Sequence, residues 1–150
     1  MRSSIEKWCS VFNRKIRTEI NRRCSKYGLH EANFFYLIIV DEHPGISQNY
    51  LIQTIQREQS IVTKHINHLV ADGWLRKDVA KNDRRKNELF LTQKGRDVIP
   101  VLDQIMEDIS HESVAGLTDN EAETLEKMLE KAARTYAVSY THLRAHETPE

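Results

Sequence analysis

Lys64 and Asn67 lie three residues apart in a segment that has the apolar spacing of a short helix. Val62, Ile66 and Leu69 recur at helical steps within residues 60–72, so they predict a buried face. Lys64 and Asn67 fall on the opposite face, where lysine can donate to the acceptors of guanine and asparagine can pair with adenine. Further candidates for DNA contact on this face and its flanks are Ser60, Ile61, Thr63 and His68. The alternative is that all of them are ordinary exposed helix residues.

Arg84 and Arg85 lie in a short polar stretch between two segments that alternate apolar and polar residues. The alternation over residues 75–79 and 87–91 predicts a two-stranded hairpin with a basic tip. Arginines at such a tip can enter a narrow minor groove of DNA. A phosphate would repel Asp83, so we expect its carboxylate to hold a neighbouring arginine in place. The alternative is a surface salt bridge of little energetic weight.

Two short helices precede the hairpin. Ser47 predicts the start of the first, over residues 47–55, and Ser60 predicts the start of the second, over residues 60–72. Two short helices joined by a tight turn form a helix-turn-helix, and a basic hairpin directly after them makes a winged helix. Ser47 and Asn49, with the backbone amides at the start of the first helix, are predicted to contact phosphates.

Long amphipathic helices flank this lobe along the chain. One apolar stripe runs from Ile5 to Ile20 and another from Leu125 to Tyr136, each at helical spacing. The stripes are longer than the small lobe can cover, so we expect a homodimer. The predicted fold is mainly α with a small β-hairpin wing (α+β), with a winged helix-turn-helix lobe at residues 31–96 and a helical dimerisation region at residues 1–30 and 97–137.

The net charge of zero conceals a segregated charge distribution. Residues 1–30 carry eight Lys/Arg against two acids, and residues 44–96 carry ten against five, whereas residues 97–137 carry three against ten. The basic segments suit a surface that binds nucleic acid, with the acidic segment kept away from phosphates. Solvated faces without a partner explain the same charges equally well.

Composition and motifs exclude several other classes of protein. With 39% hydrophobic and 29% charged residues, a globular chain is expected, and no apolar run is long enough for a membrane span. No signal-peptide core follows Met1, and Cys9 and Cys24 form neither a disulfide framework nor a metal-type pair, so a cytoplasmic location is expected. The sequence has no Ser/His/Asp arrangement, phosphate-binding glycine loop or cluster of metal ligands. We therefore expect no enzyme, no cofactor and no metal site.

Three short motifs, taken in this order and spacing, resemble the MarR family. They are SIVTKHINHLVADGWL from Ser60, NDRR from Asn82, which contains the Asp-x-Arg of Asp83 and Arg85, and LTQKG from Leu91. The order of six helices is also similar, so the resemblance covers roughly residues 5–137. It implies a homodimer whose first and last helices interlock and whose two winged lobes bind a near-palindromic operator in double-stranded DNA. It also implies repression that is relieved by a small ligand, an oxidant or a metal.

Aromatic residues supply a candidate effector pocket between the dimer helices. The candidates are Trp8, Phe12, Phe35 and Tyr36. Packing in the core or at the dimer interface is the alternative, and it is the one that we favour.

Cys9 and two histidines are weaker candidates for chemistry. Cys9 lies about where the hydroperoxide-sensing branch of the family carries its reactive cysteine, but Arg23 and Ala32 stand near the places of that branch's two tyrosines. We therefore favour a partly buried structural cysteine. His65 and His68 share a helix without a carboxylate or cysteine cluster, which favours a surface role over a metal site.

Residues 138–150 lack the apolar stripe of the helix before them. Their sequence resembles one reading frame of a transposase adapter used in preparing sequencing libraries, so we expect a non-native or disordered tail without function. For the rest of the chain the leading hypothesis is a sequence-specific DNA-binding transcriptional repressor. The alternative is a winged helix that serves as a protein-interaction module and does not bind DNA.

Overall fold

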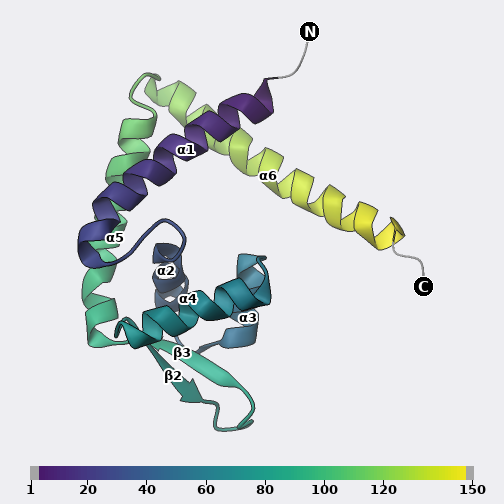
Figure 1. Cartoon of the computed structure of the whole chain (residues 1–150). Coiled ribbons are helices and arrows are strands. Elements are labelled where there is room, and N and C mark those ends of the chain that lie inside the picture. The colour runs from purple at the N-terminus through teal and green to yellow at the C-terminus, as the bar shows by residue number, and fades with distance from the viewer. Residues whose placement is uncertain (1–3, 148–150) are drawn as a thin grey trace. The chain divides into compact units, whose positions relative to one another are not determined.

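The computed structural model describes the backbone of residues 4–147 and the side chains of residues 4–136 (Figure 1). The chain divides into two compact units, Met1–Ile109 and Ser110–Glu150, which we describe separately. The elements of the first unit are α1 (Ile5–Cys24), the 3-10 helix η1 (Ser25–Tyr27), α2 (Phe34–Glu42), β1 (Ile46–Ser47), α3 (Gln48–Ile55), α4 (Gln59–Ala71), β2 (Leu75–Val79), β3 (Asn87–Leu91) and most of α5 (Gln93–Ser113). The second unit holds the last residues of α5 and the long helix α6 (Asp119–Glu147).

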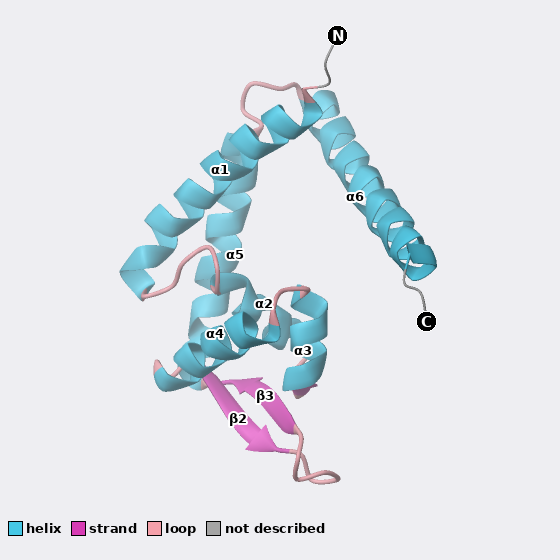
Figure 2. Ribbon diagram, turned by 45° about the vertical axis from the view of Figure 1, so that its right-hand side comes forward, coloured by secondary structure: helices cyan, strands magenta, loops and turns pink. Residues whose placement is uncertain are grey.

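The predicted fold class is confirmed, with one strand that the sequence did not indicate. Strands β2 and β3 form the expected antiparallel hairpin, in which Leu75 pairs with Leu91 (Figure 2). The additional strand β1 pairs with the other edge of β3, so the sheet has the order β1-β3-β2. Because β1 contains only two residues and a helix follows it at once, it is too short to show the alternation that marks a strand.

Helix ends agree with the sequence in part. Ser47 caps α3 as expected, since its hydroxyl accepts the backbone N–H of Tyr50 at 3.1 Å. The expectation that Ser60 caps α4 is wrong: the N-cap is Glu58, and Ser60 lies inside the helix. The turn between α3 and α4 instead contains Gln56 in the left-handed region, at φ 56°. This places the start of the second helix two residues earlier than the cap preference predicts.

One hydrophobic core unites the lobe with the inner parts of α1 and α5. Val62, Ile66 and Leu69 of α4 are fully buried, as predicted, and they fix which face of α4 points outward. The same cluster contains Leu89 and Leu91 of β3. The long helices contribute Ile20 and Cys24 from α1, and Val98, Ile99, Leu102 and Ile109 from α5.

The outer parts of the two terminal helices are different. On α1, Ile5 is 74% exposed and Trp8 is 61% exposed, although both belong to the same apolar stripe as the buried Ile20. On α6, Met128 is 65% exposed and Tyr136 is 73% exposed. Helix α6 begins with a capping box, in which Thr118 and Glu121 exchange backbone–side-chain hydrogen bonds at 3.0 and 3.2 Å.

A tight joint links the base of the hairpin to α5. The Thr92 hydroxyl lies 2.6 Å from the carbonyl oxygen of Gly73 and accepts the backbone N–H of Gly95 at 3.1 Å. A Cβ atom at Gly95 would collide with the carbonyl oxygen of Trp74, so this position requires glycine. Lys94 donates to the carbonyl oxygen of Asp72 at 2.8 Å and lies 4.1 Å from the ring centre of Trp74. The start of α5 is therefore held against the end of α4 and the start of β2.

The helix α6 continues past Ala137, where the sequence predicted that the native or ordered chain ends, and runs to Glu147. Residues 148–150 of that predicted tail lie outside the described residues. None of the described helices is long and apolar enough to cross a membrane.

Candidate nucleic-acid interface

The outward face of α4 carries the predicted DNA-contacting side chains. Ser60, Lys64, Asn67 and His68 are exposed, Ile61 is also exposed, and Thr63 is half-buried. An open hollow of about 710 Å³ runs along this face, lined by Gln59, Ser60, Thr63, Lys64, Asn67 and His68. Gln59 was not predicted, because the sequence placed it in the break before the helix. The helix thus presents one continuous polar face that the buried side chains behind it hold in place.

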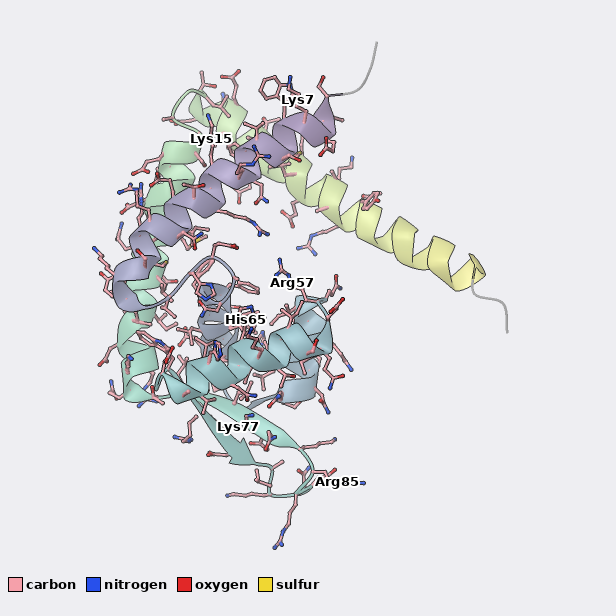
Figure 3. All side chains as sticks on the ribbon, in the orientation of Figure 1. Lys7, Lys15, Arg57, His65, Lys77 and Arg85 are labelled. Atoms are coloured by element: carbon pink, nitrogen blue, oxygen red, sulfur yellow. The ribbon has the colours of Figure 1, made fainter. Side chains whose placement is uncertain are left out.

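Asn67 is tied to the hairpin by a contact that the sequence did not indicate. The ammonium group of Lys77, on β2, donates to Oδ1 of Asn67 at 3.0 Å. Lys77 and Asn67 are ten residues apart and belong to different elements, so no periodicity within one element could have predicted the pair. The outer face of α4 and the hairpin therefore form one connected polar surface, with Lys77 at its centre and Arg85 at its tip (Figure 3).

The tip of the hairpin has the geometry predicted for Asp83 and Arg85. Oδ1 of Asp83 accepts the backbone N–H of Arg85 at 3.0 Å and its Nε at 3.3 Å. The backbone hydrogen bond from Arg85 lowers the pKa of Asp83 most, and the side-chain hydrogen bond from Arg85 and the charge of Lys86 lower it further. Arg85 is nonetheless 92% exposed on its side chain, and Arg84 is exposed as well. Asp83 thus orients an arginine that remains accessible, and its contact with DNA stays a prediction.

The start of α3 offers a smaller polar patch. The Ser47 hydroxyl is engaged as the helix cap, and Ser47 is half-buried, whereas Asn49 is exposed. Tyr50, which the sequence analysis did not single out, is also exposed. A phosphate contact by Ser47 or Asn49 stays a prediction.

His65, for which a surface role was predicted, is half-buried on the side of α4 that faces α2. Its ring centre lies 5.8 Å from that of Tyr36 on α2 and 5.7 Å from that of His30. The Nδ1 atom of His65 and the hydroxyl oxygen of Tyr36 are both buried and have no hydrogen-bond partner among the described residues. Burial lowers the pKa of His65, and the positive charges of His30, His68, Arg57 and Lys64 lower it further; burial raises the pKa of Tyr36.

The four residues of the predicted effector pocket have different environments. Phe35 and Tyr36 are in ring contact, with centres 4.9 Å apart, and Tyr36 is fully buried. Trp8 and Phe12 lie on α1, where Trp8 is largely exposed and Phe12 half-buried. An effector pocket at these residues stays a prediction.

The cysteines correct another expectation. Cys9 is exposed and not partly buried, whereas Cys24 is buried, which raises the pKa of its thiol. Among the side chains of residues 4–136, no group of three or more His, Cys, Asp or Glu is placed to hold a metal ion.

Comparison with known proteins identifies relatives of similar length. The HTH-type transcriptional regulator YybA of Bacillus subtilis is 25% identical over 116 residues, which is 77% of each chain. The HTH-type transcriptional regulator BilQ of Clostridioides difficile is 28% identical over 71% of this chain and 73% of its own. The transcriptional repressor MprA of Escherichia coli is 24% identical over 82% of this chain and 71% of its own. All three are named as transcriptional regulators or repressors, in agreement with the prediction that this chain is not an enzyme.

Solved structures share the fold. A MarR regulator from Methanosarcina mazei superimposes with a TM-score of 0.83 at 22% identity, covering 91% of this chain and 98% of its own. A mutant of Escherichia coli MarR complexed with operator DNA gives a TM-score of 0.78 at 24% identity, covering 85% of this chain and 92% of its own. The lobe that carries α4 and the hairpin also matches the MarR family over residues 29–86. Residues 29–86 therefore match the MarR family, and the chain has the winged helix-turn-helix fold of the MarR structures.

Proposed function

We propose that this MarR-family transcriptional regulator binds a near-palindromic operator in double-stranded DNA as a homodimer and represses transcription until a small ligand or an oxidant releases it. The observation that carries the proposal is the connected polar surface formed by the outer face of α4 and the basic hairpin. On this surface Lys64 and Asn67 are exposed, and Arg85 extends from the tip. Such a helix suits the major groove, and an arginine-bearing wing suits the minor groove.

The charge distribution supports DNA as the partner. Residues 44–96, which contain α3, α4 and the hairpin, carry ten Lys/Arg against five acids. Residues 97–137 carry the opposite excess, with three against ten. A surface that neutralises phosphates releases counterions, so its affinity for DNA must fall steeply as salt rises.

The exposed apolar residues of the terminal helices support a dimer. Ile5 and Trp8 on α1 and Met128 and Tyr136 on α6 face solvent in the single chain, and exposed apolar patches of this kind mark protein interfaces. A second copy of the chain is the occupant that a two-fold symmetric operator requires. Two α4 helices would then contact successive major grooves about 34–36 Å apart.

The names of the relatives and solved structures support repression and DNA binding. MprA is named a transcriptional repressor. The MarR mutant of Escherichia coli was solved in complex with operator DNA. We extend repression and DNA binding to this chain because residues 29–86 match the MarR family. The half-buried and buried aromatic residues Phe12, Phe35 and Tyr36 are candidates to contact an effector, together with Trp8.

The experiment is a binding titration on the DNA upstream of the protein's own gene and on scrambled DNA, each at two salt concentrations. Arg85→Ala is expected to weaken binding to both DNAs and to lower the salt slope by about one unit for the lost phosphate neutralisation. Asp83→Ala is expected to weaken operator binding in part, because Arg85 keeps its charge but loses its orientation. Arg134→Ala on α6 removes the same charge outside the lobe and is the matched control.

The outcomes separate two functions. Salt-sensitive binding that Arg85→Ala weakens and Arg134→Ala does not would support DNA contact by the hairpin. Absence of any salt-sensitive binding would contradict it and would favour the alternative, a winged helix that binds another protein.

A further inference from the structure

The contact between Lys77 and Asn67 bears on which base the α4 helix can recognise. Lys77 lies on the edge strand β2, and its ammonium donates to Oδ1 of Asn67 at 3.0 Å. The next residue, Asp78, points to the other face of the strand, where Arg76 donates to its carboxylate at 3.1 Å. The carboxylate of Asp78 therefore binds Arg76 and not Lys77, and the ammonium of Lys77 binds the side-chain amide of Asn67.

An asparagine that binds adenine must both donate and accept. Its amide nitrogen donates to N7 of adenine, and its amide oxygen accepts from the N6 amino group. In this protein the oxygen already accepts from an ammonium. The oxygen keeps a second lone pair, but an adenine amino group that approached it would lie beside the positive ammonium, and the two donors would compete for one oxygen.

Guanine has the complementary groups. Its major-groove edge offers two acceptors, N7 and O6. The amide nitrogen of Asn67 and the ammonium of Lys77 together present only N–H donors. Because the oxygen of Asn67 is held, its amide is also kept from flipping to present an acceptor outward.

We propose that Lys77 is a specificity-determining residue: by holding the amide oxygen of Asn67, it makes this point of the interface a surface rich in donors, which favours guanine over adenine. The proposal rests on the proposed DNA-binding function and deepens it. It also replaces the expectation, based on asparagine alone, that Asn67 pairs with adenine.

The test is selection of bound duplexes from a pool randomised in both half-sites, followed by affinity measurements on duplexes that differ by guanine or adenine at single positions. For the wild type, one position per half-site is expected to prefer guanine over adenine by roughly 5- to 100-fold. Lys77→Met keeps the aliphatic stem but removes the donor, so the preference at that position is expected to disappear or turn to adenine. Lys77→Arg still donates to the oxygen and is expected to keep the guanine preference.

Three controls make the result specific. Asn67→Ala is expected to remove the preference at the same position as Lys77→Met. Lys81→Met removes a different lysine of the hairpin and is expected to lower affinity for all duplexes alike, with base preferences unchanged. Thermal unfolding of each variant checks that the lobe is folded, and Lys77→Arg provides a second, conservative variant if Lys77→Met does not fold.

Failure of the inference differs from failure of the proposed function. If the wild type binds DNA but Lys77→Met keeps every base preference, or Lys77→Arg loses the guanine preference, the role of Lys77 is overturned and DNA binding stands. If the wild type binds no duplex from the pool, both are overturned.

Discussion

Helices α4 and α6 have the same kind of apolar stripe in the sequence but differ in what covers it. In α4, Val62, Ile66 and Leu69 are fully buried by the chain itself. In α6, Met128, Leu129 and Tyr136 belong to a stripe with helical spacing and are exposed. Helical periodicity therefore indicates that one face is apolar, and it does not indicate whether the chain's own core or another molecule covers that face.

The difference also decides how each stripe contributes to stability. Burial within the chain stabilises the fold at any protein concentration. A stripe that a second copy covers contributes only to the extent that the dimer is populated, so its contribution depends on protein concentration. Substitutions in the two stripes should therefore have effects of different size and kind.

The largest effect is expected from Ile66→Ala in α4. Ile66 is fully buried, so its truncation removes apolar burial and leaves a cavity that costs about 2–5 kcal/mol of the free energy of unfolding. Urea unfolding at fixed protein concentration measures the change. Lys64→Ala, on the exposed face of the same helix, is the control and should change the free energy by less than about 0.5 kcal/mol. Equal urea midpoints for Ile66→Ala and Lys64→Ala would show that burial of the apolar face of α4 does not stabilise the fold.

The next effect is expected from Met128→Glu in α6. If a second copy covers this stripe, an unpaired carboxylate placed there must be desolvated, which should weaken dimerisation at least about tenfold. Sedimentation across a range of concentrations measures it, and binding to a full operator should weaken in parallel. Lys127→Ala changes the charge by the same amount on the opposite face of α6 and should leave the dimer intact. A dimer that tolerates Met128→Glu would place the interface elsewhere.

A smaller effect, dependent on pH, is expected from His65, a polar residue that faces the covered side of α4. Burial lowers its pKa first, and the positive neighbours His30, His68, Arg57 and Lys64 add to this. Below the ordinary value of 6.5 the unfolded chain therefore binds more protons than the folded chain, so stability falls as pH drops from 6.5 toward the lower folded pKa.

The measurement for His65 is the free energy of unfolding between about pH 7.5 and pH 5.5, a window that starts above the ordinary pKa of 6.5 and extends below it. His65→Gln should show a smaller loss over this window than the wild type, because it has no group to protonate. His43→Gln, at an exposed histidine that is not among the neighbours of His65, is the control and should follow the wild type. If His65→Gln and the wild type lose stability equally, His65 does not carry the pH dependence.

The smallest effect is expected from deletion of residues 138–150. The sequence has no apolar periodicity there, so the deletion should leave the melting temperature, the sedimentation coefficient expected of a dimer and the affinity for DNA unchanged. Calorimetry and the binding titration described above measure it. A marked drop in melting temperature would mean that this end of α6 packs against another surface. Part of α6 would then be buried, as the apolar face of α4 is.

Local patterns in the sequence were sufficient for much of the fold. The buried face of α4 follows from three apolar residues at helical steps, and the capping box of Thr118 and Glu121 follows from two residues three apart. The contact of Asp83 with Arg85 spans only two residues, so a short motif could predict it. In each case the residues concerned are at most seven positions apart in the sequence.

Contacts between elements were not predictable in the same way. Lys77 meets Asn67, and His65 meets Tyr36 and His30, only because separate elements pack together. His65 is half-buried and not fully at the surface as expected, because its ring lies against Tyr36 of α2 and His30. The early start of α4 was missed because Glu58, a residue with a weak preference for the N-cap position, takes that place instead of Ser60.

The joint at residues 92–95 has a consequence for how the hairpin moves. Thr92, Lys94 and Gly95 fasten the first turn of α5 to the end of α4 and to the start of β2. A hinge at this point would have to break those bonds, so the hairpin and the first turns of α5 should rotate together as one rigid piece. The direction in which Arg85 points is then set by the axis of α5, and a ligand or partner that tilts this part of α5 would re-aim the wing tip without ever contacting it.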